Sequence, residues 1–470
     1  MVTTSRAPSA SRRTRSQVLQ REHFIGLAGL TIALFPFLSA VAQPEAQAAD
    51  AAADAATRPR IRLDFGAGQT DNLFHDTTNL RSDISSLGFL LNVGADRPRL
   101  QGRFATNLEA RKYGAGSIGN DSEVVGSVDG GLQVKIVPDR FAWTFEQNYG
   151  QTRINALAPV GPENRDRTTV FSTGPQVVVP LNERNDFVFT GRVSDRRYVQ
   201  LTQLDSDLVT TTIAFSHKVD AATKLGVSLD QRTSNYNLSN DSFVFQTVSF
   251  TYARELAAGS IDAELGHGDV KTGQTSRSTT IGEISWARKV GAHSKLNTWV
   301  NRQITDAGEL FRIGGFAGNG SDIMGGFANS IDVNADRLQG IVPVPDPIAR
   351  SSAGLMLTLV ARLTTLRLST NVVKDDFLSA KAFNDNLKIF LVSVDRPIGR
   401  RWNGLLTLQK TSQEFSQTTV RNHDVSSRVG IDRQIRLKLQ LRLALEHFRR
   451  EGGLGLYDER MYRVSIGYTF

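Results

Sequence analysis

The sequence predicts an all-β protein, a transmembrane antiparallel β-barrel of about 20 strands, with 18 as the alternative count. Three observations predict this class. From Arg60 to the C-terminus, segments of about 10–15 residues alternate apolar and polar side chains. Very short turns and longer polar loops join these segments alternately. After Ala42 no apolar run reaches the ~18 residues that a membrane-spanning helix needs.

The composition favours β-structure and excludes thiol chemistry. The chain has 470 residues, 40 of them Gly, and Phe (25) greatly outnumbers Tyr (8). Ser, Thr and Asn are abundant, which is typical of strands and turns rather than of helix bundles. Because the chain contains no Cys, it has no disulfide framework, no thiolate metal site and no Cys nucleophile.

Residues 1–42 are predicted to be a signal peptide. Five Arg and a single acid, Glu22, precede or open an apolar stretch from Phe24 to Ala42, and small-residue cleavage sites end at Ala42 and Ala48. A membrane anchor is the alternative, but Pro36 interrupts the apolar stretch. Residues 43–59 are Ala-rich and predict a short periplasmic tether, which leaves residues 60–470 for the barrel.

The charge does not indicate a nucleic-acid partner. The formal net charge is +8, and the first 42 residues contribute +4 of it (five Arg minus one Glu), so the remainder carries about +4. No basic block interleaved with aromatic residues follows the signal segment.

Nine short turns divide the barrel region into strands. Nine hairpins contain eighteen strands, and a first strand (about 60–67) and a last strand (about 458–470) bring the count to twenty. With an even number of strands both ends of the barrel lie on the side of the short turns, which faces the periplasm. The predicted turns are 96–99, 137–140, 180–184, 220–223, 256–259, 290–293, 361–364, 396–400 and 433–436.

The two faces of the strands are consistently different. Phe141, Trp143, Phe145 and Tyr149 share one face of a strand, and every second residue from Leu437 to Leu445 is Leu. A closed barrel with lipid outside needs no second core layer and leaves no backbone edge unpaired, unlike a soluble sandwich. No repeat of fixed sequence supports a propeller or a solenoid.

Function is expected on the face turned to the lumen, because the other face contacts lipid. Both charge signs occur there together with Thr, Ser and Asn, which suits a hydrated neutral or mildly anionic solute. The alternative is a water-filled wall whose charges pair with one another across strands. The predicted pore-lining residues are Arg103, Glu109, Arg111, Asp129, Lys135, Glu146, Arg192, Lys218, Asp230, Arg232, Glu264, Arg367, Arg428, Lys438, Arg442 and Glu446.

Residues 309–350 form the longest predicted connection, on the outer side of the membrane. It is Gly-rich and contains two Gly-Gly-Phe repeats. Such a loop is usually functional or disordered. One prediction is a loop that folds over or into the pore and constricts it; a mobile surface loop is the equal alternative. The constriction residues would be Phe316, Asp322, Phe327, Asp332 and Asp336.

No motif for catalysis, a metal or a cofactor is present. The chain has seven His, but no HExxH, no GxSxG and no phosphate-binding Gly loop. The Asp spacing around Asp322 lacks the pattern of an EF-hand. We therefore expect no enzyme activity, no catalytic residues, no metal and no cofactor, although a barrel hydrolase could assemble its site from distant strands.

The C-terminal strand resembles an assembly signal. Tyr462, Tyr468 and the final Phe470 alternate with polar residues, as in the signal that the insertion machinery of Gram-negative outer-membrane barrels reads. The resemblance implies outer-membrane lipid and the barrel-assembly machinery as partners.

A second resemblance lies at the start of the barrel. "RLDFGAGQTDNLF" (62–74) is similar to the opening of the β-barrel porins encoded with bacterial exopolysaccharide operons. That resemblance implies passage of a secreted polysaccharide across the outer membrane, with periplasmic export proteins as further partners. A general diffusion porin for small hydrophilic solutes and an outer-membrane barrel hydrolase are the alternatives.

Overall fold

The computed structural model describes residues 60–73, 80–114, 122–155, 158, 162–237, 242–273, 275–310, 344–416, 420–452 and 455–470. The predicted signal peptide (1–42) and tether (43–59) lie outside the described residues. They therefore stay predictions.

The described residues form twenty strands and three short 3-10 turns. Segments that alternate apolar and polar residues become strands because the side-chain period of a strand is two. The 3-10 turns are η1 (Pro162–Asn164), η2 (Thr202–Leu204) and η3 (Lys381–Phe383). The strands are β1 (Arg60–Thr70), β2 (Ser82–Arg97), β3 (Leu100–Tyr113), β4 (Ser122–Val137), β5 (Phe141–Arg153), β6 (Arg165–Pro180), β7 (Asn185–Tyr198), β8 (Ser206–Lys218), β9 (Thr223–Tyr236), β10 (Ser242–Leu256), β11 (Gly259–Thr272), β12 (Thr275–Lys289), β13 (Ser294–Thr305), β14 (Ile348–Ala361), β15 (Thr364–Phe377), β16 (Asp385–Pro397), β17 (Trp402–Phe415), β18 (Arg421–Arg436), β19 (Leu439–Gly452) and β20 (Gly455–Thr469).

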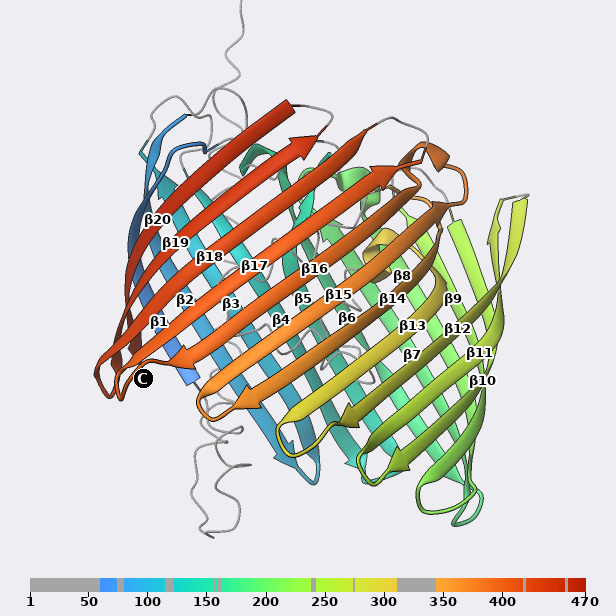
Figure 1. The fold of residues 1–470 in the computed structure, drawn as a ribbon. Coiled ribbons are helices and arrows are strands. Elements are labelled where there is room, and N and C mark those ends of the chain that lie inside the picture. The colour runs from blue at the N-terminus through green and yellow to red at the C-terminus, as the bar shows by residue number, and fades with distance from the viewer. Residues whose placement is uncertain are drawn as a thin grey trace, which may run out of the picture. The chain divides into compact units, whose positions relative to one another are not determined.

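The sheet closes on itself. Each strand pairs antiparallel with the next strand in the chain, and β1 pairs with β20 from Arg62↔Thr469 to Thr70↔Met461 (Figure 1). Closure gives every strand a neighbour on both sides, although the β12–β13 ladder begins only at Gly282. An unpaired edge in hydrocarbon would cost several kcal/mol per exposed polar group. The prediction of an antiparallel barrel of about 20 strands is confirmed.

The barrel has a short-turn end and a loop end. Nine connections of two to four residues lie at the short-turn end, for example 98–99, 257–258 and 362–363. Both ends of the barrel chain lie there too, since the Phe470 N–H donates to the Ile61 carbonyl at 3.0 Å. In the 219–222 turn the Ala222 N–H donates to Asp220 Oδ1 at 2.7 Å and lowers the pKa of that carboxyl.

One predicted turn is wrong. The sequence predicts a turn at 433–436, but β18 continues to Arg436 and the turn is 437–438. Arg433 still pairs with Leu441, and a bulge between Gln434 and Arg436 absorbs the irregular register. The run of alternating Leu continued across the turn and hid it, and Leu437 itself is 97% exposed.

The Thr-Asp-Asn sequence at the end of β1 fastens the seam between the first and last strands. Thr70 Oγ1 donates to Glu459 Oε1 at 2.5 Å, and Asn72 Nδ2 donates to the Asp458 carbonyl at 3.0 Å. The Arg460 N–H donates to Asp71 Oδ1 at 2.7 Å. Thr70 and Asn72 are fully buried. These bonds continue the β1–β20 ladder beyond its last paired residues.

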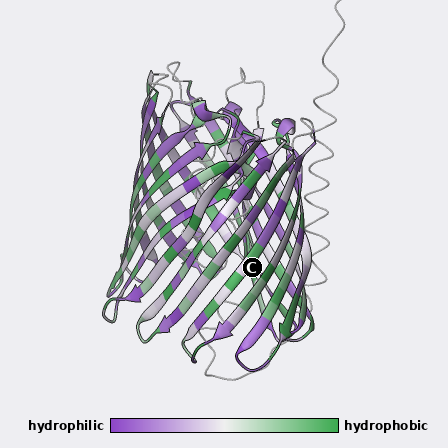
Figure 2. Ribbon diagram, turned by 90° about the vertical axis from the view of Figure 1, so that its right-hand side faces the viewer, coloured by the Kyte–Doolittle hydropathy of each residue, from purple (hydrophilic) through white to green (hydrophobic). Residues whose placement is uncertain are grey.

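The outer face of the barrel is apolar, as contact with lipid requires. Residues directly opposite one another in an antiparallel pair share a face, so the register carries one face around all twenty strands. On the outer face Phe65, Leu265 and Val300 are 61%, 65% and 59% exposed. Figure 2 shows hydrophobic and hydrophilic residues alternating along the strands.

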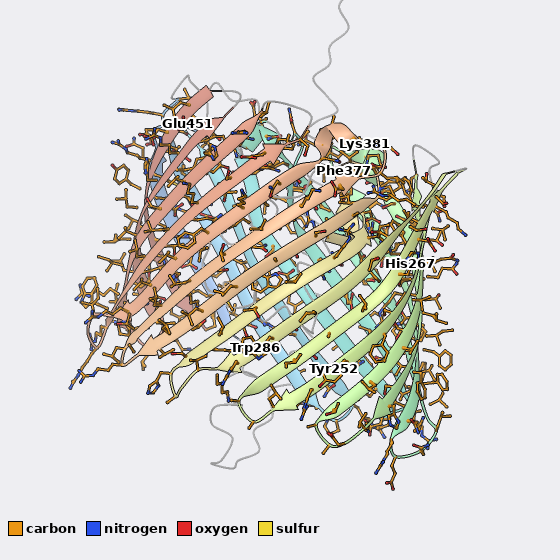
Figure 3. All side chains as sticks on the ribbon, turned by 45° about the vertical axis from the view of Figure 1, so that its right-hand side comes forward. Tyr252, His267, Trp286, Phe377, Lys381 and Glu451 are labelled. Carbon is orange, nitrogen blue, oxygen red and sulfur yellow. The ribbon has the colours of Figure 1, made fainter. Side chains whose placement is uncertain are left out.

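Aromatic side chains gather on the outer face near the short-turn end. Trp143, Trp286 and Trp402 lie within a few residues of a short turn, and Tyr468 packs edge-to-face on Phe470 with centroids 5.0 Å apart. Figure 3 shows Tyr252 and Trp286 at the same end. Such a band sits at the membrane interface of outer-membrane barrels, where an amphipathic ring contacts lipid and headgroup together.

Among the described residues no helix is long and apolar enough to span a bilayer.

We expect Asn72→Ala to weaken the seam. The substitution removes the part-buried hydrogen bond from Asn72 to the Asp458 carbonyl, at a cost of about 0.5–1.5 kcal/mol. The barrel should lose its compact gel mobility at a lower temperature or urea concentration in heat-modifiability assays. Gln69→Ala is the matched control, because Gln69 lies on the exposed outer face of the same strand and should change nothing. Equal behaviour of both variants would contradict a fastening role for Asn72.

Candidate functional site

The candidate site is the inner face of the barrel. Of the sixteen residues predicted to line the pore, fifteen lie on the inner face by register. Lys438 is the exception and its assignment to the wall is wrong, because it lies in the 437–438 turn. Whether solutes touch the other fifteen stays a prediction.

Arginine and carboxylate side chains pair across the inner face beside the seam. Arg463 Nη1 lies 3.1 Å from Glu109 Oε1, and its Nη2 lies 2.9 Å from Glu446 Oε1. Arg428 Nη2 is 3.5 Å from the same Glu446 oxygen, and Arg111 Nη2 is 2.8 Å from Glu109 Oε2. One network therefore joins β3, β18, β19 and β20.

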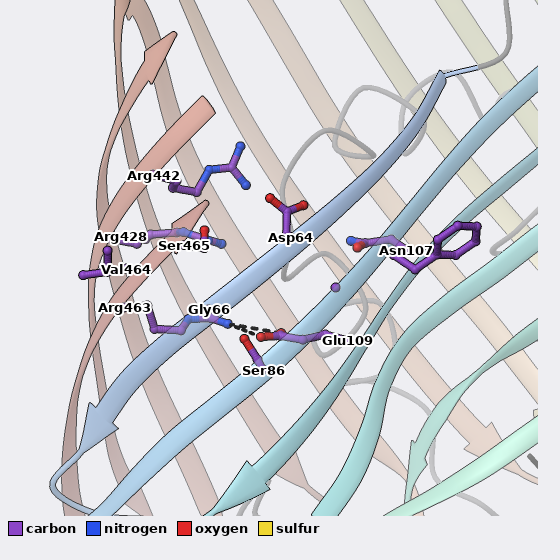
Figure 4. Close-up of a pocket in the computed structure, with 13 residues that line it drawn as sticks. Asp64, Gly66, Ser86, Asn107, Glu109, Arg428, Arg442, Arg463, Val464 and Ser465 are labelled. Atoms are coloured by element: carbon purple, nitrogen blue, oxygen red, sulfur yellow. Dashed lines mark hydrogen bonds and ion pairs between the residues drawn. The ribbon is translucent and has the colours of Figure 1, made fainter. Parts of the chain in front are cut away.

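Two further pairs extend this wall toward the short-turn end. Arg442 Nε donates to Asp432 Oδ1 at 2.7 Å, and Arg62 Nη2 donates to Asp64 Oδ1 at 2.5 Å. Figure 4 shows the recess between these groups, in which Arg428, Arg442 and Arg463 approach Asp64 and Glu109. Gly66 lines this recess and leaves room for it. A Cβ on Gly66 would meet Ser86 Oγ at 2.5 Å.

A buried ion-pair network fixes the start of the β13–β14 connection against β7 and β9. Arg196 of β7 is fully buried, and its Nη1 donates to Asp306 Oδ1 at 2.7 Å. Its Nη2 lies 3.3 Å from Glu309 Oε2, and Arg232 Nη1 lies 4.0 Å from Glu309 Oε1. Asp306 also accepts the Glu309 N–H at 2.8 Å, so it caps the helical turn that begins at Ala307.

An aromatic cluster fills the loop end of the lumen beside that network. Tyr198, Tyr236, Phe243, Phe245 and Ile304 are all buried together, although they come from β7, β9, β10 and β13. Tyr236 and Phe243 pack edge-to-face at 5.5 Å. The Arg232 guanidinium lies 4.0 Å from the centre of the Phe245 ring. These buried side chains therefore fill the space between β7 and β13 at the loop end, and Ile304, whose register parity is that of the outer face, packs with the inner-face rings.

Buried pairs also stabilise the loop end elsewhere. Arg350 Nη2 lies 2.5 Å from Asp375 Oδ2, and Arg450 Nη2 lies 2.5 Å from Asp424 Oδ2. Asp346, at the far end of the β13–β14 connection, accepts the N–H groups of Ser379 and Ala380 at 2.7 and 2.9 Å. Both described ends of this connection are therefore held by carboxylates.

The long connection itself is only partly described. It spans 306–347, so residues 348–350 of the predicted loop belong to β14. The predicted constriction residues Phe316, Asp322, Phe327, Asp332 and Asp336 lie outside the described residues.

Sequence reasoning missed several of the residues that organise the inner face. Arg463 alternates with Tyr462 and Val464, so the parity that identified Arg442 would have found it. Arg196 is on the inner face of β7 by the same parity, but its partner Asp306 is 110 residues away. No local sequence signal predicts that pair.

The histidines of β11 and β19 do not face the lumen. His267 and His447 lie on the outer face by register, where their nearest acids are Asp269 and Asp458. Figure 3 shows His267 projecting from the outside of the barrel. Within the described parts of the chain, no group of His, Asp and Glu has the arrangement of a metal site.

Comparison with known proteins finds likeness in structure but none in sequence. No protein-family model matches the chain, and no curated protein sequence matches it. In structure it is similar to the siderophore receptor PirA from Pseudomonas aeruginosa, with 12% identity, a TM-score of 0.41, and coverage of 88% of this chain and 80% of that one. The FrpB iron transporter from Neisseria meningitidis (F5-1 variant) gives 10% identity, a TM-score of 0.44, and coverage of 88% and 81%. Acinetobacter baumannii OccAB4 gives 8% identity, a TM-score of 0.36, and coverage of 88% and 98%.

These likenesses concern the barrel fold alone. The closed sheet, the apolar outer face and the aromatic band define the class independently: the chain is an outer-membrane β-barrel.

We expect Arg196→Met to destabilise the loop end. The substitution leaves Asp306 and Glu309 buried without their cation, and breaking a buried pair in this way typically costs about 3–5 kcal/mol. The urea midpoint of unfolding in detergent should fall. Arg196→Met combined with Asp306→Asn and Glu309→Gln should recover much of the loss, because no buried charge is then left unpaired.

The neighbouring Arg197 provides the control. It is 46% exposed on the outer face and pairs only with exposed acids, so Arg197→Met should change the free energy of unfolding by less than about 1 kcal/mol and hardly move the midpoint. A midpoint for Arg196→Met no lower than that of Arg197→Met would refute the role assigned to the buried network.

Proposed function

We propose that the protein is a non-enzymatic channel through which hydrophilic solutes cross the outer membrane. The observation that supports it is a twenty-strand barrel whose inner face carries charged, hydroxyl and amide side chains. Barrels of about 16 or more strands are wide enough to enclose water.

The paired charges of the inner face suit the passage of a solute through the lumen rather than its tight binding. Arg463, Arg442 and Arg62 each contact a carboxylate, so the wall offers hydrogen bonds to a solute without a large excess of one sign. The buried cluster between β7 and β13 at the loop end directs the path of a solute toward the rest of the lumen.

The narrower proposal is a secreted exopolysaccharide as cargo. Its support is the resemblance of residues 62–74, but in the structure Thr70, Asp71 and Asn72 of that segment fasten the seam. A general diffusion porin therefore explains the wall equally well. Deletion of the gene separates the two, because only the exopolysaccharide channel requires loss of extracellular polysaccharide with unchanged uptake of small solutes.

An outer-membrane hydrolase is less well supported. Hydrolysis in a barrel needs a base beside a nucleophile, and His267 and His447 lie on the lipid face. Turnover of a lipid or glycan that disappeared on substitution of a strand His would restore this alternative.

The C-terminal strand is the expected contact of the assembly machinery. Tyr462 and Tyr468 are exposed on the outer face, and Phe470 follows β20 as an exposed ring. Outer-membrane lipid and, for a polysaccharide cargo, periplasmic export proteins complete the proposed partners.

Planar-bilayer recording of the purified full-length protein tests the channel directly. Discrete conductance steps in KCl are expected. No conductance from the protein, even with residues 309–350 removed, would overturn the proposal.

We expect Arg103→Glu to shift the ion selectivity of the channel toward cations. Arg103 is exposed on the inner face of β3 and makes no ion pair with the described residues, so reversal of its charge acts on the lumen directly. The reversal potential in a KCl gradient measures the shift. Lys112→Glu makes the same charge change on the outer face of the same strand and should leave the reversal potential unchanged. Identical potentials for the two variants would contradict the assignment of the lumen.

A further inference from the structure

One Trp of the barrel faces the lumen. The chain has four Trp, and the register places Trp143, Trp286 and Trp402 on the outer face near the short-turn end. Trp299 of β13 lies on the inner face, opposite Ser285 and Gly354, while its neighbour Val300 is 59% exposed on the outer face. The interfacial band that accounts for the other three therefore does not account for Trp299.

The Trp299 ring lies against the backbone of Gly354. A Cβ on Gly354 would meet Cε2 and Cη2 of that ring at 2.6 and 2.7 Å. Only Gly leaves room for an indole at this place. The side chain stays half-buried, so part of the ring surface remains open to the lumen.

Polar side chains surround the ring in two adjacent rows across the sheet. In one row Asp262, Ser285, Trp299, Gly354 and Asn371 face one another in sequence across β11 to β15. The next row contains, in order, Glu264, Glu283, Asn301 and Ser352. The register places all nine residues on the inner face; eight have side chains there, and the ninth is Gly354.

Several of these groups lack partners in the described part of the chain. The Oδ1 atoms of Asn301 and Asn371 are buried and accept no hydrogen bond. Glu264 and Glu283 lie directly opposite each other, although like charges in that position repel. Asn301 Nδ2 donates to Glu283 Oε2 at 3.0 Å, but no Lys or Arg of the described residues pairs with Glu264 or Glu283.

An open aromatic face beside carboxylate and amide acceptors matches the surface of a sugar ring. A pyranose has an apolar C–H face that can stack on indole, and hydroxyl groups at its edge that donate to carboxylates and amides. Three carboxylates without a cation disfavour an anionic sugar. We propose that Trp299, with Asp262, Glu264, Glu283 and Asn301, forms a binding subsite for a pyranose unit of a neutral oligosaccharide or polysaccharide.

This subsite rests on the proposed channel and narrows its cargo. The opposite wall, around Arg463 and Arg442, pairs its own charges, and the aromatic residue that lines its recess, Phe89, belongs to the outer face by register. A neutral polymer would therefore contact the β11–β15 wall first.

Current block by sugars in planar bilayers tests the subsite. Maltohexaose and cellohexaose should interrupt the current of the full-length protein for longer than a polyethylene glycol of similar size, because exclusion of volume alone needs no stacking. In Trp299→Ala the residence time of the sugars should fall about tenfold, the upper range of what an aromatic contact contributes. Trp299→Phe should restore part of it, and Trp286→Ala, which removes an outer-face ring, should leave it unchanged.

Two results would overturn the subsite. One is a residence time in Trp299→Ala equal to that of the unaltered protein. The other is a block by neither sugar beyond that of polyethylene glycol. In both cases conductance itself would persist, so the proposed channel would stand without the subsite.

A fluorescence titration covers the case in which no conductance is seen. With Trp143, Trp286 and Trp402 changed to Phe, Trp299 is the sole indole of the chain. In detergent, maltohexaose or cellohexaose should shift its emission saturably, and an anionic hexasaccharide of uronic acid should bind at least tenfold more weakly. No saturable shift with either neutral sugar would overturn the subsite, and a shift without conductance would overturn the channel alone.

Discussion

The pairing of β1 with β20 is the constraint on which the rest of the structure depends. A strand edge in hydrocarbon leaves a row of N–H and C=O groups without partners, and no side chain facing lipid can satisfy them. The seam is therefore fastened twice, by the ladder from Arg62↔Thr469 to Thr70↔Met461 and by the Thr70, Asp71 and Asn72 bonds beyond it. Once the sheet is closed, the period of two assigns every strand residue to lipid or to the lumen.

Closure also explains why so many charges can lie on the inner face. In a soluble sandwich this face would be a dry core, where each ion would need a full set of partners. Beside the seam the Arg463, Glu109 and Glu446 groups share a polar recess. At the loop end the situation differs. Arg196 and Asp306 are fully buried there, so their pairing holds the buried cluster between β7 and β13 in one arrangement.

Local pattern was sufficient to predict the fold and most of the inner face, because both follow from alternation along single strands. The same alternation gave a wrong prediction where no typical turn residue marks the turn. The alternating Leu residues from 437 to 445 continue through the turn at 437–438, and Lys438 was placed on the wall for that reason. Contacts between distant strands could not be predicted from local sequence. The Arg196–Asp306 pair and the stacking of Trp299 on Gly354 depend on curvature and register of the closed sheet, which no local window contains.

Cysteine labelling tests the central claim most directly, because the chain has no Cys of its own. Single Cys residues at Ser465 and Thr247 on the inner face, and at Val464, Ile466 and Val248 on the outer face, sample two distant strands. In liposomes a membrane-impermeant maleimide should modify the inner-face positions and spare the outer-face positions, and all five should react after denaturation. Equal labelling of both sets in liposomes would show that the apolar face does not meet lipid and would contradict the account.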